Sequence, residues 1–370
     1  MGEEKTNTQA VERESVLFPI LKDGARGMAR MAEMATYADD GHLVEFRAME
    51  VRSVLNRSIS KRKLSLAYSI NPYRGCEFGC RYCYARYTHE FLAPRERPAV
   101  ERAIGADLRQ AEAFERVIFL KKNAAWLLEQ ELRKIDPEEE IALGTATDPY
   151  QPIERRAMVT RSLLEVFSRK SGYRLGIVTK SRLIERDIDL LTVIARRNRL
   201  VVHVTITTPD AELARKLEPR APRPDLRFAA VRRLRQAGIC TGILCSPLLP
   251  GITDDAKSID DMAGRAAEAG ASFFAAQPLF LKSCSRPTYL SFVREHFPAL
   301  EAEYDERFST ADFAAQPYRR RMSVMVADAC RRHGIPERST DALLTRDAGL
   351  VRREPQGIGI AGKQQCLFGS

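Results

Sequence analysis

Segments with strand character and segments with helix character alternate through the middle of the chain, and this alternation limits the fold more than any other feature. Each short apolar run is followed by a helical pattern of roughly 10–18 residues, which is typical of βαβ units and a parallel sheet. Repeated this often, such units predict a full or partial (β/α) barrel of the α/β class, with its ligand-binding residues at the carboxyl ends of the strands. The predicted strands cover residues 64–70, 117–121, 141–147, 173–179, 200–207, 239–246 and 271–278.

The chain divides into four regions by composition and pattern. Residues 1–63 form a polar, increasingly basic lead-in, and residues 64–285 carry the barrel pattern. Residues 286–354 are predicted to be helical, and residues 355–370 form a Gly-rich polar tail that we expect to be flexible. The predicted helices cover residues 123–134, 153–170, 183–197, 210–217, 225–237, 255–269, 287–296, 299–308 and 319–333.

Composition separates this chain from several classes of protein. With 370 residues and 44% hydrophobic content, it is large enough for one or two packed domains. It has no apolar run near the ~20 residues that span a bilayer and begins with a charged segment, so we expect a cytoplasmic protein with no membrane partner. The net charge of +10 favours a polyanionic partner such as nucleic acid, although a basic surface kept for solubility explains it equally well.

Three of the eight cysteines lie close together just after the first predicted strand. Cys76, Cys80 and Cys83 have the spacing C-x3-C-x2-C, and in a cytosolic chain such clustering is typical of metal or cluster ligands. Iron–sulfur clusters are usually held by four cysteines, so a loop with three predicts a cubane with one iron open to a cofactor or substrate. Gly75 and Gly79 give the loop freedom to wrap tightly. The alternatives are a zinc site completed by a distant histidine and three unrelated thiols.

Polar residues follow two of the predicted strands, where a barrel binds its ligands. Thr145, Thr147 and Asp148 end the 141–147 strand, and Lys180 with Ser181 follows the 173–179 strand. We expect this group to contact a ligand, with Lys180 pairing with a carboxylate of a bound cofactor. The alternatives are a turn or helix cap for Asp148 and a solvated loop position for Lys180.

The 200–207 strand alternates between an apolar and a polar face. Val202, Val204 and Ile206 share one face and His203, Thr205 and Thr207 the other, so the polar face must point into the barrel. His203 and Thr205 are therefore candidate site residues, although a lone strand histidine is more often structural. Arg220, just before the 225–237 helix, is predicted either to clamp a carboxylate or to form an ion pair within its loop.

The cysteine loop and the sequences around it together resemble a known family. C-x3-C-x-Y-C after a first strand is similar to the signature of the radical S-adenosylmethionine superfamily. Further motifs resemble the branch related to spore photoproduct lyase, whose members are often labelled DNA repair photolyase. The resemblance runs from about residue 65 to 280 and rests on NPYRGC (71–76), TDPYQP (147–152), TKS (179–181) and PLLPG (247–251).

This resemblance implies a partial (β/α)6 barrel with a helical C-terminal extension. It implies that Cys76, Cys80 and Cys83 hold a [4Fe–4S] cluster whose open iron chelates S-adenosylmethionine. An electron from a donor such as flavodoxin or ferredoxin would then cleave the cofactor to methionine and a 5′-deoxyadenosyl radical, which abstracts hydrogen from the substrate. The protein itself would position the cofactor and exclude water and oxygen.

The resemblance also bears on individual residues near the loop. It implies that Tyr82 lies against the cofactor and that Tyr84 relays a radical, whereas the alternative for both is aromatic packing behind the cluster. Many members carry a Gly-Gly-Glu-like turn for the methionine amino group, and spore photoproduct lyase keeps a hydrogen-donor cysteine in the same region. Residues 145–148 read TATD and contain neither, so thymine-dimer repair by the same route is not implied. Cys284 is the least implausible substitute donor.

Basic segments and the tail suggest macromolecular partners. Residues 52–63, 319–321 and 331–332 could contact the phosphates of DNA or another nucleic acid, or could form solvated helix faces. The tail from Gln364 to Phe368 resembles the peptide with which bacterial repair and replication proteins bind the sliding clamp.

These observations lead to three hypotheses about function. The first is a radical S-adenosylmethionine enzyme, of lyase or modification type, that acts on DNA in a repair-like reaction. The second is the same radical chemistry applied to RNA, a protein or a small metabolite. The third is a non-catalytic protein that binds nucleic acid and carries a structural iron–sulfur cluster.

Overall fold

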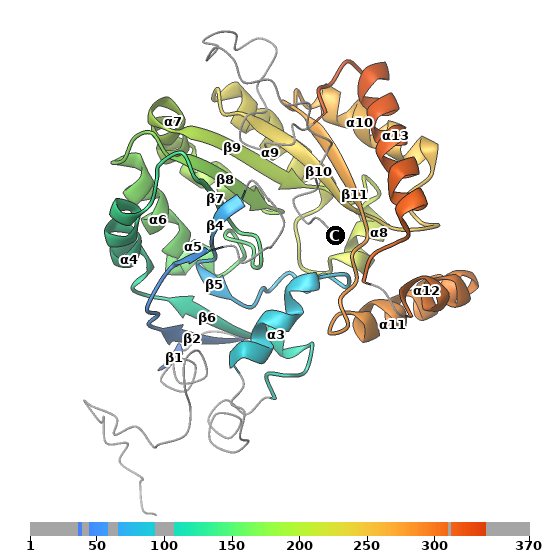
Figure 1. Ribbon diagram of the computed structural model, residues 1–370, viewed down its shortest axis with the longest axis horizontal. Coiled ribbons are helices and arrows are strands. Elements are labelled where there is room, and N and C mark those ends of the chain that lie inside the picture. The colour runs from blue at the N-terminus through green and yellow to red at the C-terminus, as the bar shows by residue number, and fades with distance from the viewer. Residues whose placement is uncertain (1–35, 39–43, 58–65, 93–106, 310–311, 338–370) are drawn as a thin grey trace, which may run out of the picture.

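A seven-stranded sheet forms the centre of the computed structural model, which describes residues 36–38, 44–57, 66–92, 107–309 and 312–337 (Figure 1). Its strand order is β11-β10-β9-β8-β7-β4-β3. The edge strand β3 (Leu55–Arg57) is antiparallel to its neighbour. The other six strands run parallel: β4 (Leu66–Ile70), β7 (Glu140–Leu143), β8 (Arg174–Thr179), β9 (Arg199–Thr205), β10 (Thr241–Leu248) and β11 (Phe274–Pro278).

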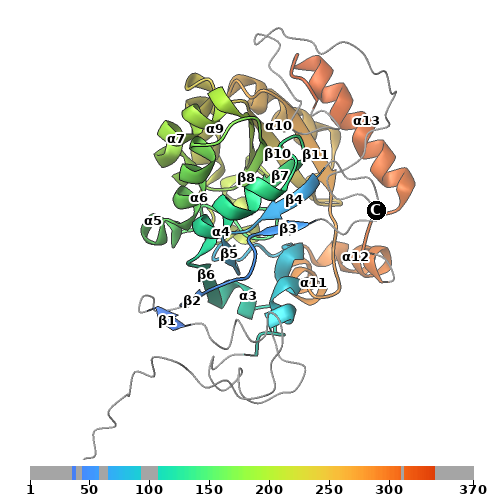
Figure 2. The same cartoon turned by 60° about the vertical axis from the view of Figure 1, so that its left-hand side comes forward.

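Helical segments alternate with the parallel strands from β7 onward, and the larger helices cover the outer face of the sheet (Figures 1 and 2). Within the described ranges, β3 and β11 lie at opposite edges and are not paired with each other. This arrangement confirms the predicted partial (β/α)6 barrel of the α/β class. The connecting segments are α5 (Glu154–Ala157), α6 (Val159–Ser168), η3 (Arg182–Asp187), α7 (Ile188–Arg197), α8 (Ala211–Leu217), α9 (Pro224–Gln236) and α10 (Ala256–Glu268).

The two faces of β9 differ as the sequence pattern predicts. Val202 and Val204 are buried in the main core, which the sheet forms with its covering helices. On the opposite face, His203 packs against Phe273 with the ring centroids 5.3 Å apart. Val201 joins Phe273 in a small separate apolar cluster on this face. The face that carries His203 therefore points into the barrel.

Two of the connecting helices differ from the prediction. The helix expected at 153–170 is interrupted at Met158, whose φ of +54° lies in the left-handed region. The helix expected at 183–197 begins with a 3-10 segment, and Ser181 caps it because its hydroxyl accepts a hydrogen bond from the Leu183 amide (3.2 Å). Apolar periodicity continues across both irregularities, so the sequence pattern does not reveal them.

A second, four-stranded sheet lies beside the start of the barrel, below β4 in Figure 1. Residues 117–121 form a strand as predicted, but their expected place in the barrel is wrong, because β6 pairs with β2 and β5 instead. Every residue of β6 is buried, and a continuous apolar run fits any sheet that is covered on both faces. The order is β1-β2-β6-β5, with β1 (Thr36–Ala38), β2 (Glu45–Met49), β6 (Val117–Lys121) and β5 (Tyr73–Arg74), followed by α4 (Ala124–Glu131) and η2 (Leu132–Lys134).

The described part of the C-terminal region, residues 286–309 and 312–337, is mostly helical, as predicted. Its longest helix packs against α10 and β11 (Figure 1). Tyr304 is buried, and its hydroxyl donates to the carbonyl oxygen of Pro250 (2.7 Å), which ties this region to the loop after β10. Of the described helices, none combines the length and the apolar composition needed to cross a bilayer. The helices are α11 (Arg286–His296), η4 (Pro298–Leu300), α12 (Glu301–Phe308) and α13 (Gln316–Arg332).

Several predicted features fall outside the residues that the structure describes. They are the tail at 355–370 with the docking peptide from Gln364 to Phe368, the end of the predicted helical region at 338–354, the basic run at 58–63, and most of the lead-in before residue 44. All of them stay predictions.

Candidate active site

The cysteine loop begins directly after β5 and passes closely over the segment before β6. The Cys76 amide donates a hydrogen bond to the Phe114 carbonyl oxygen (2.8 Å), which lies in the short helix α3 (Ala113–Arg116). Gly75 has φ +83°, and a Cβ at this position would lie 2.8 Å from the carbonyl oxygens of Phe114 and Val117. Only glycine allows so close an approach in this conformation, so this glycine fixes how the loop leaves the sheet.

The second half of the loop is held by backbone contacts from three directions. The Cys80 carbonyl oxygen accepts hydrogen bonds from the Arg86 guanidinium (3.0 Å) and the Cys83 amide (3.2 Å). The Ser285 hydroxyl, just before α11, donates to the Cys83 carbonyl oxygen (2.6 Å). The Arg81 amide donates to a carbonyl oxygen at the end of α8 (2.9 Å). The three cysteines are therefore positioned by segments from distant parts of the chain.

Two buried polar side chains join this loop to the loop after β7. Gln151 accepts a hydrogen bond from the Glu77 amide (2.9 Å) and donates one to the Gly75 carbonyl oxygen (3.2 Å). The Glu77 carboxylate accepts in return from the Ile153 amide (2.7 Å). These reciprocal bonds fix the loop that carries the cysteines against the segment that carries TDPYQP.

The three thiols share an environment that opposes the thiolate form. Burial raises the pKa of Cys76 well above its ordinary value, with the nearby Asp148 carboxylate acting in the same direction. Burial also raises the pKa of Cys83 and raises that of Cys80 to about 12. Metal ligands must be deprotonated, so binding of iron here would release protons and supply the missing positive charge.

The donor set fits an iron–sulfur cubane. Within the described ranges, no three His, Cys, Asp or Glu side chains are arranged to hold a single metal ion, these thiols included. A cubane does not require that arrangement, because each cysteine binds a different iron. Cys76, Cys80 and Cys83 are half-buried or buried, lie on one short loop and influence each other's pKa values. Soft thiolates of this kind are the usual ligands of iron–sulfur clusters.

A buried charge network lies beside Cys80, at the carboxyl ends of β8 and β9. The Tyr82 hydroxyl contacts the Thr207 hydroxyl (2.8 Å) and donates to the Glu218 carboxylate. Glu218 forms an ion pair with Arg227 of α9 (2.5 Å), and both side chains are almost fully buried. The Lys180 ammonium lies 5.6 Å from the centre of the Tyr82 ring. This network places a cation and a carboxylate next to the cysteine loop.

The two charges are stabilised by their neighbours. Burial disfavours the ammonium form of Lys180, yet its pKa is raised because Cys80 and Glu218 together outweigh burial. Burial likewise disfavours the Glu218 carboxylate, yet its pKa is lowered because Arg227 and Lys180 outweigh it. Lys180 is therefore charged and half-buried, its ammonium group forms no hydrogen bond among the described residues, and its charge suits an anionic ligand group.

Asp148 fastens two strand-end loops together. Its carboxylate accepts hydrogen bonds from the Thr179 hydroxyl (2.7 Å), the Lys180 amide (2.7 Å) and the Tyr150 amide (2.9 Å). Burial raises the pKa of this carboxyl group, although the three donors favour the charged form. The structure thus shows Asp148 in a turn-forming position that also joins β7 to β8.

The threonines after β7 are held by the NPYRGC segment. Asn71 accepts hydrogen bonds from the amides of Ala146 (2.8 Å) and Thr147 (3.2 Å), and the Thr147 hydroxyl donates to the Tyr73 carbonyl oxygen (3.3 Å). The Tyr84 hydroxyl donates to the half-buried Thr145 at its carbonyl oxygen. The structure therefore brings both threonines and Tyr84 to the cysteine loop.

Other predicted site residues make different contacts. The Arg220 guanidinium donates to the Glu77 carbonyl oxygen and pairs with Glu115 (3.4 Å), so it braces the cysteine loop from outside. Ser181 caps η3, as described above. The Thr205 carbonyl oxygen accepts from Arg227 (3.1 Å). His203 lies further down β9, with its ring against Phe273.

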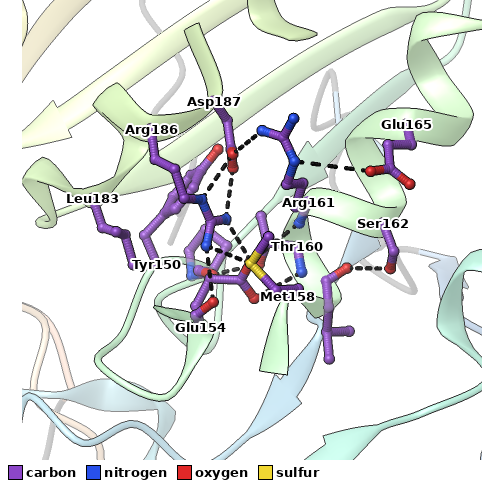
Figure 3. A network of polar contacts seen from close by, with 12 residues as sticks. Tyr150, Glu154, Met158, Thr160, Arg161, Ser162, Glu165, Leu183, Arg186 and Asp187 are labelled. Atoms are coloured by element: carbon purple, nitrogen blue, oxygen red, sulfur yellow. Dashed lines mark hydrogen bonds and ion pairs between the residues drawn. The ribbon is translucent and has the colours of Figure 1, made fainter. Parts of the chain in front are cut away.

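A second ionic network supports the loop after β7 from behind, as Figure 3 shows. Arg186 pairs with Glu154 (2.8 Å) and with Asp187 (2.8 Å), and Asp187 also pairs with Arg161 (2.6 Å). The Tyr73 hydroxyl donates to Glu154, which links this network to β5 and the start of the cysteine loop. The network therefore connects the segments that follow β7 and β8 with the loop that bears the thiols.

Sequence reasoning missed several residues that build this site. In the sequence, Glu218 is one of several charged residues in a predicted loop, and Arg227 is a charged residue of the helix that follows. Gln151 was noted only as part of the TDPYQP motif. Their common property is burial with a specific partner far away in sequence, which one sequence does not display. The one available signal was the retention of polar residues at strand ends.

A profile of the Radical SAM superfamily matches residues 70–263. The uncharacterized protein Rv2578c of Mycobacterium tuberculosis is 30% identical over 309 residues, covering 83% of this chain and 86% of that protein. The uncharacterized protein MJ0683 of Methanocaldococcus jannaschii is 27% identical over 187 residues, covering 50% of this chain and 62% of that protein.

Solved structures support the same fold. Spore photoproduct lyase complexed with dinucleoside spore photoproduct matches with a TM-score of 0.51 and 14% identity, covering 84% of this chain and 83% of that chain. A cysteine variant of the same enzyme matches with a TM-score of 0.52 at the same identity and coverage. The profile covers more than half of the chain, and the mycobacterial relative covers most of it. This chain therefore belongs to the Radical SAM superfamily.

Proposed function

We propose that this protein reductively cleaves S-adenosylmethionine at a [4Fe–4S] cluster held by Cys76, Cys80 and Cys83, and so starts hydrogen abstraction from a nucleic-acid substrate. Membership of the superfamily brings radical catalysis with S-adenosylmethionine and an iron–sulfur cluster as cofactors. The proposal adds the cluster type, the ligands and the substrate class.

One observation carries the assignment of the ligands. Three thiols lie on a single loop at the carboxyl end of the barrel, next to a charged lysine and a buried carboxylate. Ligands bind at this end in barrels of parallel strands, because the loops that follow the strands converge there. A fourth cysteine ligand is not provided within this loop, which leaves one iron for the cofactor.

The chain's own residues would bind and orient the cofactor. Lys180 would pair with the cofactor carboxylate, a role supported by the neighbouring Glu218, which favours its charged form. Tyr82 is held by Glu218 and Thr207, so its ring and backbone form a fixed wall beside Cys80. Tyr84, whose hydroxyl donates to the Thr145 carbonyl oxygen, would relay the radical to the substrate. When bound, the cluster and S-adenosylmethionine supply a carbon-centred radical that abstracts hydrogen from the substrate.

The substrate class is the finer part of the proposal. The fold matches spore photoproduct lyase, for which a complex with a dinucleoside is known, and the chain carries a net charge of +10. The stretch 145–148 lacks a cysteine to return a hydrogen atom, so we propose a reaction on nucleic acid other than the same thymine-dimer repair. Modification of a protein or small metabolite is the alternative within enzymes.

Anaerobic reconstitution tests the proposal. Full-length protein loaded with iron and sulfide should absorb near ~400 nm, as expected of thiolate-ligated iron–sulfur clusters. After reduction with dithionite, it should release 5′-deoxyadenosine from S-adenosylmethionine, measured by liquid chromatography with mass detection. Cys80→Ala should lose both the absorption and the product.

Matched variants separate the ligands from other thiols. Cys330→Ala removes a buried cysteine on α13, far from the loop in sequence, and should keep absorption and cleavage. Stoichiometric zinc with no iron uptake would reject the cluster. A fully loaded, reduced protein that binds oligonucleotides without releasing 5′-deoxyadenosine would favour the non-catalytic binding protein.

A further inference from the structure

A row of aromatic rings leads away from the cysteine loop. The rings of Tyr84 and Phe280 are 6.0 Å apart between centroids, and Phe280 stacks on Phe313 at 4.4 Å with an angle of 25° between the planes. A backbone bridge holds the last pair in register, because residue 280 pairs with residue 313 in antiparallel fashion. Both phenylalanines are only half-buried, so part of each ring faces solvent.

Two cations flank these rings. The Lys282 ammonium lies 4.4 Å from the centre of the Tyr87 ring and 5.8 Å from that of Phe280. The Arg319 guanidinium lies 5.8 Å from the centre of the Phe313 ring. We call Tyr87, Phe280, Phe313, Lys282 and Arg319 the aromatic rim. Its members come from η1 (Tyr84–Leu92), from the segments after β11 and before α13, and from α13 itself.

The positive charge of the rim has no carboxylate counter-charge among the residues that the structure describes. Among the described residues, neither Lys282 nor Arg319 forms an ion pair with a carboxylate, and the same holds for Arg320 and Arg321, which follow on α13. The nearby Asp312 pairs with Arg286 instead (3.5 Å). Within the described part of the chain, these four cations, one in the segment after β11 and three at the start of α13, therefore have no carboxylate partner.

The other end of α13 behaves differently. Arg331 pairs with Asp328, and Arg332 pairs with Asp260 of α10 (2.7 Å). The arginines at the two ends lie on one helix and share the same chemistry, so composition does not explain the difference. The start of α13 is the end linked to the candidate active site, since Phe313 stacks on Phe280, whose ring lies 6.0 Å from that of Tyr84.

We infer that the aromatic rim binds a single-stranded segment of nucleic acid, with bases against Phe280 and Phe313 and phosphates on Lys282 and the arginines of α13. Alternating aromatic faces and cations are the combination that proteins use for unpaired strands, because every base has a face that stacks and every nucleotide carries a phosphate. An acidic peptide would use the cations but would make no stacking contact with the half-buried rings. The inference rests on the proposed function in one respect only, namely that the adjoining cysteine loop is the site of the radical chemistry.

Binding to the intact, reconstituted protein tests this inference. Fluorescence anisotropy would follow labelled single-stranded DNA and single-stranded RNA of about twelve nucleotides, a duplex of the same length and a poly-glutamate peptide. We expect single strands to bind more tightly than the duplex, and the DNA and RNA arms show which sugar the rim accepts. Phe313→Leu keeps an apolar side chain but removes the stacking face, and should weaken binding about tenfold.

Charge variants give an independent measurement. Arg320→Gln removes one exposed positive charge. It should lower the slope of log Kd against log salt by about one, because one fewer phosphate is neutralised. Arg331→Gln, at the paired end of the same helix, should leave Kd within about twofold. Unchanged Kd in both Phe313→Leu and Arg320→Gln would overturn the inference, as would equal binding of poly-glutamate, which would indicate an acidic protein partner.

The outcome is distinguishable from failure of the proposed function. Release of 5′-deoxyadenosine without substrate tests the cysteine loop, and Arg331→Gln, which lies outside both the loop and the rim, should keep it. Binding of single strands without cleavage of S-adenosylmethionine would support the rim as a binding surface and reject the proposed radical chemistry. Cleavage by all variants, with no binding of any oligonucleotide, would reject the rim alone.

Discussion

The floor of the candidate site and the aromatic rim treat charge in opposite ways. The floor consists of two ion pairs whose carboxylates are buried, Glu218 with Arg227 (2.5 Å) and Glu154 with Arg186 (2.8 Å), so each of its carboxylates has a close cation. On the rim, the cations have no carboxylate partner among the described residues. A buried charge must be paired, because desolvation is costly, whereas an exposed cation is stable in water alone. The floor charges therefore hold the structure, and the rim charges are free to bind.

The strongest test of this contrast removes one floor charge. Glu218→Gln leaves the Arg227 guanidinium buried without its counter-ion and should lower the free energy of unfolding by about 3–5 kcal/mol. Glu129→Gln, which removes the carboxylate of a partly exposed pair with Lys170, should cost less than about 1 kcal/mol. Urea denaturation of both variants measures the difference. Equal losses in the two variants would show that burial does not determine how much the Glu218–Arg227 pair contributes to the free energy of unfolding.

Glycine substitutions sharpen the comparison within the cysteine loop. Gly79 has φ +61°, and a Cβ there would lie 2.5 Å from a Glu115 carboxylate oxygen and 2.6 Å from an Arg220 guanidinium nitrogen. Gly238 has φ +78°, with no described atom within 4 Å of such a Cβ. Alanine at either position costs about 1–2 kcal/mol, because a side chain disfavours the left-handed conformation. Only at position 79 must Glu115 and Arg220 also move. Gly79→Ala should therefore lose about 1 kcal/mol more than Gly238→Ala and also bind less iron. Identical stability and iron content would contradict this.

Lys121, on β6, offers an intermediate case of a buried cation that is weakly compensated. Burial, together with Arg74, lowers its pKa to about 7, against the influence of Glu131. Between that value and its ordinary 10.5, the unfolded chain binds a proton that the folded chain lacks. The free energy of unfolding should therefore rise with pH in this window, by at most about 1.4 kcal/mol per pH unit. Lys121→Met should reduce the slope and be the more stable protein at pH 7. Urea denaturation from pH 7 to 9 measures the free energy of unfolding of both proteins. The same pH dependence in the unchanged protein and in Lys121→Met would contradict the lowered pKa of Lys121.

The smallest effect is expected on the rim. Arg320→Gln should change the free energy of unfolding by less than about 0.5 kcal/mol, because the exposed side chain has no described ion-pair partner. Thermal and urea unfolding of the variant would show this. A loss as large as that of Glu218→Gln would mean that the rim arginine supports the fold and is not held for a ligand.

Sequence patterns predicted the barrel strands because those strands are short apolar runs of fixed period between turn signals. The same signal placed residues 117–121 in the barrel, where they do not belong, since their burial is real but their partners are β2 and β5. Periodicity reports that a segment is buried on both faces and carries no information about which strands cover it. The break at Met158 was missed for a similar reason.

By itself, the sequence determined the three thiols, their spacing and the strand ends at which polar residues gather, because these are properties of local order along the chain. Only the tertiary structure decided that Glu218 and Arg227 sustain the charge of Lys180, that Arg220 braces the loop, and that Phe280 meets Phe313 beside unpaired cations. Each of these relations joins residues from separate segments. Pairing of charges and stacking of rings depend on distance in space, which folding sets and sequence order does not display.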